Sequence, residues 1–337
     1  MDKKGGNKDM NLRNIKLFML ERFTWIIAIL GYTLFILLSP SLFFNLSTVI
    51  DIFRVYAGYG VLATATGICL LSGSMDLSLP AIGGFAGVFI VEFGEVWFPD
   101  APSILLLLLP LIVGTAFGAI NGLIISKTGV HSFFVTLATT FLFIGARKVI
   151  RPGTLWIRHS EILLLPGKKI MGEVSFSIFF LILIVIIIWL ILNHTKFGMR
   201  IYAIGGGSDA ARMMGINVGN VRLLVHTIAG TIAGLSGFIF IGDVGATSPY
   251  MMDEWLFWIF AMTILGGIAI SGGRGKIENI IAGMSFIGTV DMGAHMLGIT
   301  PVARVHFTIG ILILLGIIMD SIIDKIKDRL LMPSLDR

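Results

Sequence analysis

The chain has 337 residues, of which 56% are hydrophobic and 13% charged, with a formal net charge of +5 at pH 7. Soluble globular domains carry about 25% charged residues, so this composition excludes a chain built mainly of soluble domains. The single cysteine, Cys69, excludes an intrachain disulfide. The basic balance does not indicate nucleic-acid binding, because basic loops are the usual means by which membrane proteins fix their orientation.

Long apolar runs predict a polytopic membrane protein, since about 18 consecutive apolar residues are enough to suggest a span. The clearest runs are SILLLLLPLIVGTAFGAINGLII and SIFFLILIVIIIWLILN. Two segments are weaker because they are short or broken by glycine, so eight spans with one or two re-entrant pieces remain an alternative. Ten spans are predicted in all, at 23–44, 49–71, 79–95, 103–125, 132–149, 175–193, 221–241, 256–270, 277–296 and 304–320.

Lysine and arginine residues predict the orientation. With both termini in the cytoplasm, most of the 25 basic residues fall in cytoplasmic segments, as the positive-inside rule requires. The basic start of the chain leads straight into a full span without a small-residue cleavage site, so no removable signal peptide is predicted. The organisation is a cytoplasmic N-terminus (1–22), a membrane domain (23–320) with a cytoplasmic loop (194–222), and a cytoplasmic tail (321–337).

Two glycine clusters resemble nucleotide-binding motifs but lack essential parts of them. GGGSDA at 205–210 follows a predicted membrane span, where a dinucleotide fingerprint needs a strand. GGRGK at 272–276 lacks the first glycine and the final Ser or Thr of a phosphate-binding loop. The sequence also has no Cys/His metal set and no G-x-S-x-G elbow. It therefore predicts no enzyme activity, no cofactor and no metal site.

The segment GSDAARMMGINVGNVR at 207–222 predicts a short helix in water between two membrane spans. Ser208 or Asp209 is expected to cap its first turn, and Gly215 to end it in a left-handed conformation. Methionine side chains suit a surface that repacks against a partner. A helix that a cytoplasmic partner contacts is favoured over an inert surface helix. Its small apolar surface would come from Ala210, Ala211, Met213 and Met214.

Five segments, in order from about residue 70 to 301, resemble permease subunits of bacterial ABC importers for simple sugars, the ribose type. They are LSGSMDLSLPAIGGFAG, GAINGLIISKTGVHSFFVTLATTFLFIGAR, GSDAARMMGINVGNVRLLVHTIAGTIAGLSG, TILGGIAISGGRGKIENIIAG and MGAHMLGITP. The chain departs from the family pattern around the bends between spans, which concerns the substrate more than the architecture. The departures are Ser74 for the second glycine, Leu79-Pro80 for Val-Gly, Ala138 for glycine, and Glu278-Asn279 for small residues.

The resemblance implies an all-α permease domain of the type II importer fold in the cell inner membrane, working by alternating access. It implies a second permease subunit, identical or paralogous, two ABC ATPase subunits, and a periplasmic or lipid-anchored solute-binding protein. The substrate would be ribose, another pentose or hexose, or a nucleoside. The coupling helix that contacts an ATPase would consist of Ser208, Asp209, Ala210, Ala211, Arg212, Met213, Met214, Gly215 and Ile216.

Polar residues at membrane depth are candidates for the substrate pathway, because their burial in lipid is costly. Each also has a structural interpretation. Asp76 could cap the third span, and residues inside spans could join helices to one another. The two residues on the ninth span lie four apart, on one face, and could be a solvated helix end. The candidates are Ser74, Asp76, Asn121, Thr136, Asp291 and His295.

The external segment 146–175 is the exception to the charge rule, with six basic residues. Basic side chains there could attract acidic residues of a solute-binding protein and raise its association rate. A basic segment that lies on lipid headgroups is the alternative. The docking candidates are Arg147, Lys148, Arg151 and Arg158.

An ion-coupled secondary transporter is the alternative function. Such a protein would use a buried carboxylate in mid-span and matched interrupted helices in its two halves. The Ser-Gly bends at 72–73 and 271–272 resemble such a repeat faintly, but the mid-span carboxylates are missing. The sequence therefore favours the ATP-driven importer.

Overall fold

The computed structural model describes residues 22–298 and, beyond them, 307, 310–311, 313–316, 318, 322 and 326. Within this part of the chain, helices occupy every predicted span from 23–44 to 277–296. The predicted span 304–320 and the two predicted cytoplasmic termini lie mostly outside the described residues.

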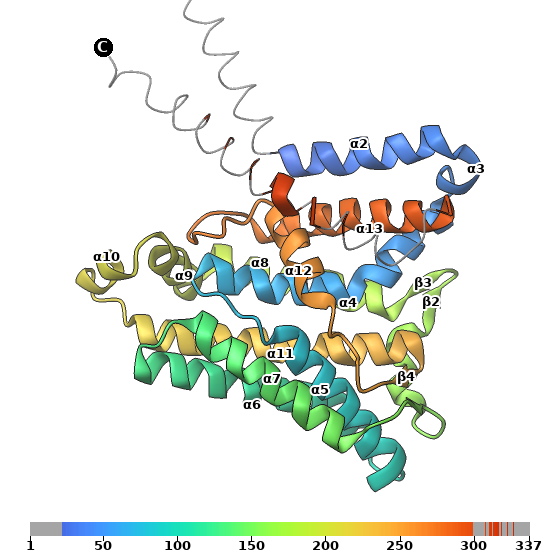
Figure 1. Ribbon diagram of the computed structural model, residues 1–337, viewed down its shortest axis with the longest axis horizontal. Helices are drawn as coiled ribbons and strands as arrows, with labels where there is room; N and C mark the ends of the chain where they lie inside the picture. Colours follow the sequence, from blue (N-terminus) through green and yellow to red (C-terminus); the bar gives the residue numbers. More distant parts are fainter. Residues whose placement is uncertain are drawn as a thin grey trace, which may run out of the picture.

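The described elements are helices of very different lengths with a few short strands (Figure 1). Strand β1 (Leu155–Trp156) pairs antiparallel with β4 (Ala246–Thr247), and β2 (Lys169–Met171) with β3 (Val174–Ser175). The helices are α2 (Phe23–Leu38), α3 (Pro40–Phe43), α4 (Leu46–Leu71), α5 (Leu79–Glu92), the π-helix η1 (Phe93–Trp97), α6 (Ser103–Thr128), α7 (Ser132–Ile150), the 3-10 helix η2 (Glu161–Gly167), α8 (Phe176–His194), α9 (Lys196–Gly206), α10 (Ser208–Met213), α11 (Val218–Val244), α12 (Trp255–Leu265), the 3-10 helix η3 (Ile277–Asn279) and α13 (Ile280–Met296).

Local sequence signals explain where the long helices begin and end. The Asn45 side chain accepts a hydrogen bond from the Ser47 amide and caps α4. Gly129 and Gly245 end α6 and α11 in the left-handed conformation, which glycine adopts without steric cost. Helix α12 ends at Leu265, before the predicted end at residue 270, because two glycines follow it.

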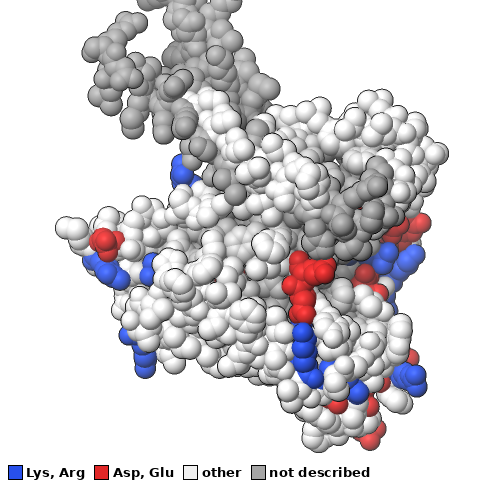
Figure 2. All heavy atoms as spheres, in the orientation of Figure 1, with Lys and Arg blue, Asp and Glu red and all other residues white. Residues whose placement is uncertain are grey.

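Six described helical segments are long and apolar enough to cross a membrane: α4, α5 with η1, α6, α7, α8 and α11. Figure 2 shows that the charged side chains of the visible face gather towards the two ends of the molecule, with a largely uncharged belt between them. Unsatisfied backbone groups are costly in lipid, so helices are the expected spanning elements. The chain is therefore a multi-pass membrane protein.

Helix α11 lies at the centre of the bundle and packs on α4, α5 and α6 (Figure 1). Glycines that recur every four residues, at 114, 118 and 122 in α6 and at 230 and 234 in α11, form the contact between the two helices. A Cβ on Gly114 would lie 2.2 Å from the Gly230 carbonyl oxygen, and one on Gly234 would lie 1.9 Å from the Pro110 carbonyl oxygen. Only glycine permits this approach, which is how helices associate where lipid supplies no hydrophobic drive between them.

The two ends of the bundle differ in structure. The end named here the α10 end carries α9, α10 and the loop 266–276, and lies at the left of Figure 1. The end named the strand end carries the four strands and residues 243–254, at the right. Between α4 and α5 the chain leaves helical geometry in the α4–α5 bend, residues 72–78.

Candidate transport site and coupling segment

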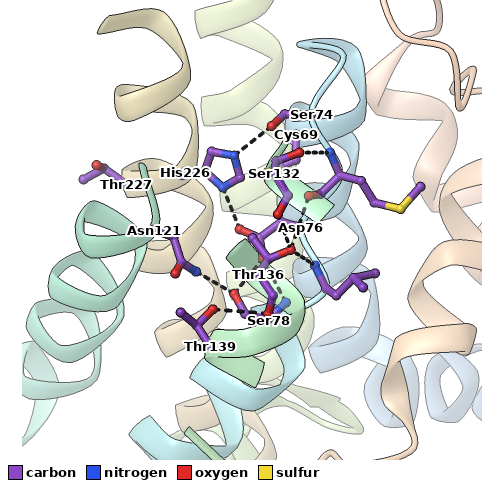
Figure 3. Close-up of polar contacts among 12 residues, drawn as sticks. Cys69, Ser74, Asp76, Ser78, Asn121, Ser132, Thr136, Thr139, His226 and Thr227 are labelled. Carbon is purple, nitrogen blue, oxygen red and sulfur yellow. Dashed lines mark hydrogen bonds and ion pairs between the residues drawn. The ribbon is translucent and has the colours of Figure 1, made fainter. Parts of the chain in front are cut away.

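Asp76 is the centre of a buried polar network in the α4–α5 bend (Figure 3). One of its carboxylate oxygens accepts hydrogen bonds from the amide (2.9 Å) and hydroxyl (2.6 Å) of Ser78. The other lies 2.7 Å from Nδ1 of His226 in α11. The second ring nitrogen of His226, Nε2, lies 2.9 Å from Oγ of Ser74. With Asp76 ionised, Nδ1 donates to the carboxylate and Nε2 accepts from the Ser74 hydroxyl.

Helices α6 and α7 complete the network. Asn121 of α6 donates from Nδ2 to the Ser78 hydroxyl at 2.8 Å, and the Leu77 amide donates to Oγ1 of Thr136 in α7 at 3.1 Å. The bend is therefore held by side chains from three long helices. It gathers four of the predicted pathway residues: Ser74, Asp76, Asn121 and Thr136 (Figure 3).

The other two pathway candidates lie together elsewhere, near the C-terminal end of α13. The Tyr56 hydroxyl donates to the Asp291 carboxylate, and Nε2 of His295 lies 3.7 Å from the same carboxylate. The His295 side chain is 55% exposed, whereas that of Asp291 is 16% exposed. The shared helix face predicted from their spacing is confirmed by this contact.

The predicted docking residues differ sharply in accessibility. The docking role predicted for Arg147 is wrong, because its side chain is fully buried. It donates hydrogen bonds to the carbonyl oxygens of Pro249 and Met251 and to the Asp253 carboxylate. Its guanidinium stabilises the loop between α11 and α12, so it does not reach a partner protein. The other three candidates are accessible to different degrees: Lys148 beside Asp253, Arg151 paired with Glu92, and the exposed Arg158.

The predicted coupling segment, residues 208–216, contains a six-residue helix, α10, at one end of the bundle. Gly207 is its N-cap, so the predicted cap by Ser208 or Asp209 is wrong: both lie inside the first turn and neither side chain caps it. Gly215 has a φ of +80°, which confirms the predicted left-handed stop. The Met213 and Met214 side chains are 91% and 70% exposed, whereas Ala211 is buried against the protein.

Comparison with known proteins decides the family. The sequence profile of the family described as "Branched-chain amino acid transport system / permease component" matches residues 48–316, most of the chain. The chain belongs to this permease family. No solved structure matches the chain.

Curated relatives of the permease extend over almost its whole length. The ribose import permease protein RbsC of Bacillus subtilis is 30% identical over 286 residues, which is 84% of this chain and 87% of the relative. The fructose import permease protein FrcC of Rhizobium meliloti is 28% identical, with 89% and 85% covered. The D-allose transport system permease protein AlsC of Escherichia coli is 27% identical, with 93% and 95% covered. The predicted resemblance to importer permeases is confirmed.

Family membership makes the chain a transport component and not an enzyme. The Ser74, His226 and Asp76 side chains follow one another in the order of a hydrolase triad, but Ser74 is only 2% exposed and is closed to solvent in this conformation. The three side chains join the bend to α11. The comparisons support an importer permease over the ion-coupled alternative.

A metal ion does not fit the same residues of the permease. Ligand atoms of Cys69, Asp76 and His226 lie within 4.8 Å of one another, which would suit a metal such as zinc. However, the Asp76 carboxylate and both ring nitrogens of His226 already have hydrogen-bond partners. The polar atoms of Asp76 and His226 are thus satisfied without an ion.

Sequence inspection missed His226 as a member of the permease's site. It lies 150 positions from Asp76, in an apolar run, and its spacing relates to no other polar residue. The available signal was its type, because an ionisable residue inside a span is a functional candidate in its own right. The contact itself depends on how α11 packs against the bend, which the sequence does not state.

Proposed function

We propose that the permease is one membrane-spanning half of an ATP-driven importer for a simple sugar or sugar-like solute. The observation that carries this is the full-length similarity to permeases named for ribose, fructose and allose. The exposed methionines of α10 support it, because they offer an adaptable apolar surface to an ATPase. Ribose, another pentose or hexose, or a nucleoside would pass by alternating access.

The proposed architecture is a type II importer bundle of ten spans with both termini inside. The helices that overlap the predicted spans support it, as does the apolar belt in Figure 2. The α10 end is then cytoplasmic and the strand end external. The organisation is an N-terminus (1–22), a permease domain (23–320) with a coupling loop (194–222), and a tail (321–337), in the cell inner membrane.

The proposed assembly has two permease subunits, identical or paralogous, two ABC ATPases and a solute-binding protein. Each coupling segment, residues 208–216, would fit a cleft on an ATPase. Arg212 supports this placement, because its side chain is 63% exposed beside the methionines and has Asp209 of its own helix as a partner. On the external side, Lys148, Arg151 and Arg158 would attract the binding protein.

The proposed pathway passes the α4–α5 bend and the Asp291–His295 pair. The exposed His295 and the half-buried Asp291 would meet a sugar hydroxyl first, since a carboxylate and an imidazole both form hydrogen bonds with hydroxyl groups. Ser74, Asp76, Asn121 and Thr136 would form the wall of the pathway. In this conformation Ser74 and Asp76 both bond to His226, Asn121 bonds to Ser78, and Thr136 accepts from the Leu77 amide.

The test is transport by the permease reconstituted in liposomes with its ATPase and solute-binding protein. ATP hydrolysis is expected to rise when binding protein loaded with D-ribose, D-fructose or D-allose is added. Labelled sugar should accumulate only when ATP is present on the side of the membrane where the ATPase lies. Sugar accumulation driven by a proton or sodium gradient without ATP would replace this function by the ion-coupled alternative.

A further inference from the structure

The helix α9, which precedes the coupling helix α10, touches the α4–α5 bend through bare backbone. A Cβ added to Gly205 of α9 would lie 1.9 Å from the Leu71 carbonyl oxygen and 2.4 Å from the Gly273 amide nitrogen. The Gly273 amide donates to the same Leu71 oxygen at 3.0 Å. A Cβ on Gly272 would lie 2.8 Å from the Cα of Gly73. These five residues form a backbone junction of α9, the end of α4 with the start of the bend, and the loop 266–276.

Helix α9 is also fixed to that loop by a side chain. The Tyr202 hydroxyl donates to the Gly275 carbonyl oxygen at 3.1 Å. Burial, together with the nearby Glu278 carboxylate, raises the pKa of the Tyr202 phenol, so the hydroxyl remains a donor at neutral pH. Helix α9 is therefore also tied to the loop 266–276, which itself contacts the bend where Gly272 meets Gly73.

The helix that follows α10 holds the same bend from another side. His226 of α11 contacts Ser74 at 2.9 Å and Asp76 at 2.7 Å, and all three side chains are buried. Helix α10 lies between these two attachments in the sequence, joined to α9 through Gly207 and to α11 through Gly215 and the residues after it. The two helices that flank the coupling helix thus contact one short segment of the chain, residues 71–76.

The bend is a segment that such attachments could move. Its first three amides still donate to carbonyl oxygens of α4. Beyond them the backbone is held by side chains of α7, since Met75 donates to Ser132 at 3.0 Å and Leu77 to Thr136 at 3.1 Å. The bend leads directly into the span formed by α5 and η1, and most residues of this span are buried inside the bundle. A change in the position of the bend relative to α7 would therefore shift the start of α5 in the centre of the protein.

We propose that the α9 and α11 flanks of α10 form a clamp on the α4–α5 bend, with Gly205, Ser74 and His226 as positioning residues, and that displacement of α10 moves the bend. The inference rests on the proposed function, since an ATPase must supply the displacement. Backbone-to-backbone contact has no flexible side chain to absorb motion, and close-packed contacts shift between discrete arrangements instead of deforming gradually.

The first test compares two neighbouring glycines. Gly205→Ala introduces a Cβ into the junction, whereas Gly206→Ala introduces one where nothing lies within 4 Å. Each variant is reconstituted with the ATPase and binding protein, and the solute imported per ATP hydrolysed is measured. Gly205→Ala is expected to lower this ratio at least about fivefold, the lower end of typical coupling between sites. Gly206→Ala should match the wild type. Co-purification with the ATPase reports assembly.

The second test compares two buried serines of the bend. Ser74→Ala removes the bond to His226, whereas Ser72→Ala removes a hydroxyl that bonds only to Cys69 within its own turn. Ser74→Ala should lower the solute imported per ATP about two- to fivefold, with ATPase assembly retained. Ser72→Ala should leave the ratio unchanged. If Gly205→Ala fails to assemble with the ATPase, the comparison of Ser74→Ala with Ser72→Ala tests the clamp by itself.

The clamp is overturned if Gly205→Ala or Ser74→Ala assembles and imports as much solute per ATP as its control. The proposed function fails separately, and visibly, if the wild-type permease shows no ATPase association or no sugar-stimulated hydrolysis. If the wild type and both variants import the same amount of solute per ATP, the clamp is ruled out and the proposed importer function is retained.

Discussion

The strand end and the α10 end of the permease are held together by different interactions. At the strand end, charged side chains join segments far apart in the sequence: Arg147 with Asp253, Arg151 with Glu92, and Arg54 with Asp243. At the α10 end, bare glycine backbones touch, and a buried histidine bonds to the α4–α5 bend.

The difference teaches where each kind of substitution does harm. Charge pairs fix loops and tolerate small shifts in the backbone, but they are sensitive to the loss of a partner. Glycine contacts are insensitive to charge, but a single methyl group must displace a backbone. The strand end is therefore suited to holding a stable surface, and the α10 end to passing motion between segments.

The largest expected effect is the loss of Arg147 at the strand end. Arg147→Leu leaves two carbonyl oxygens without their donor and leaves Asp253 with Lys148 as its remaining basic neighbour. Breaking a buried pair costs about 3–5 kcal/mol. Thermal unfolding of the detergent-solubilised permease measures the loss. Arg158→Leu, at an exposed side chain of the same segment, is the control and should unfold like the wild type. Equal stability of the two variants would contradict the pairing.

The next effect concerns glycine at the α10 end. Gly273→Ala combines left-handed backbone strain, φ +69°, with a Cβ 2.5 Å from the Gly206 nitrogen, and should cost about 2–4 kcal/mol. Gly129→Ala has a similar φ, +71°, but open space around its Cβ, and should cost about 1–2 kcal/mol for strain alone. Unfolding measurements on both isolate the contact, and equal losses would show that the junction is loose.

A smaller loss is expected at the buried network. His226→Leu leaves Asp76 without one of its donors, and an unsatisfied buried group costs about 1–3 kcal/mol. The neighbouring Thr227→Val removes a hydroxyl that bonds only within α11, to the Leu223 carbonyl. Its unfolding temperature should stay close to that of the wild type. A His226→Leu variant as stable as Thr227→Val would mean that the network contributes no stability.

The smallest effect is expected for binding-protein docking. Arg158→Glu should weaken binding of the solute-binding protein by about 0.2–1 kcal/mol, as exposed charge pairs typically do, and should reduce its salt dependence. Lys127→Glu makes the same change in net charge at an exposed residue where α6 ends, at the end of the bundle opposite the strands. Titration of reconstituted permease with binding protein compares them. Identical affinities and salt dependence would remove Arg158 from the docking surface.

The sequence predicted the helices well because lipid imposes long apolar runs, and Gly215 marked the end of α10. It predicted four members of the buried network from their cost at membrane depth, but not His226, whose role depends on how α11 packs. It placed Arg147 on the docking surface because charge patterning shows the side of the membrane and not the direction of a side chain. It misplaced the cap of α10 because Gly207 starts that helix without any side-chain bond.

The most direct test of the central claim is sugar-stimulated ATP hydrolysis in liposomes that hold the permease, its ATPase and its solute-binding protein. Wild type is compared with a variant that carries Arg212→Glu and Gly215→Pro, which alters α10 and leaves the buried network untouched. The account predicts stimulation by one loaded binding protein in the wild type, and poor assembly or uncoupled hydrolysis in the variant. A wild type that never associates with an ATPase, or a variant that transports normally, would contradict it.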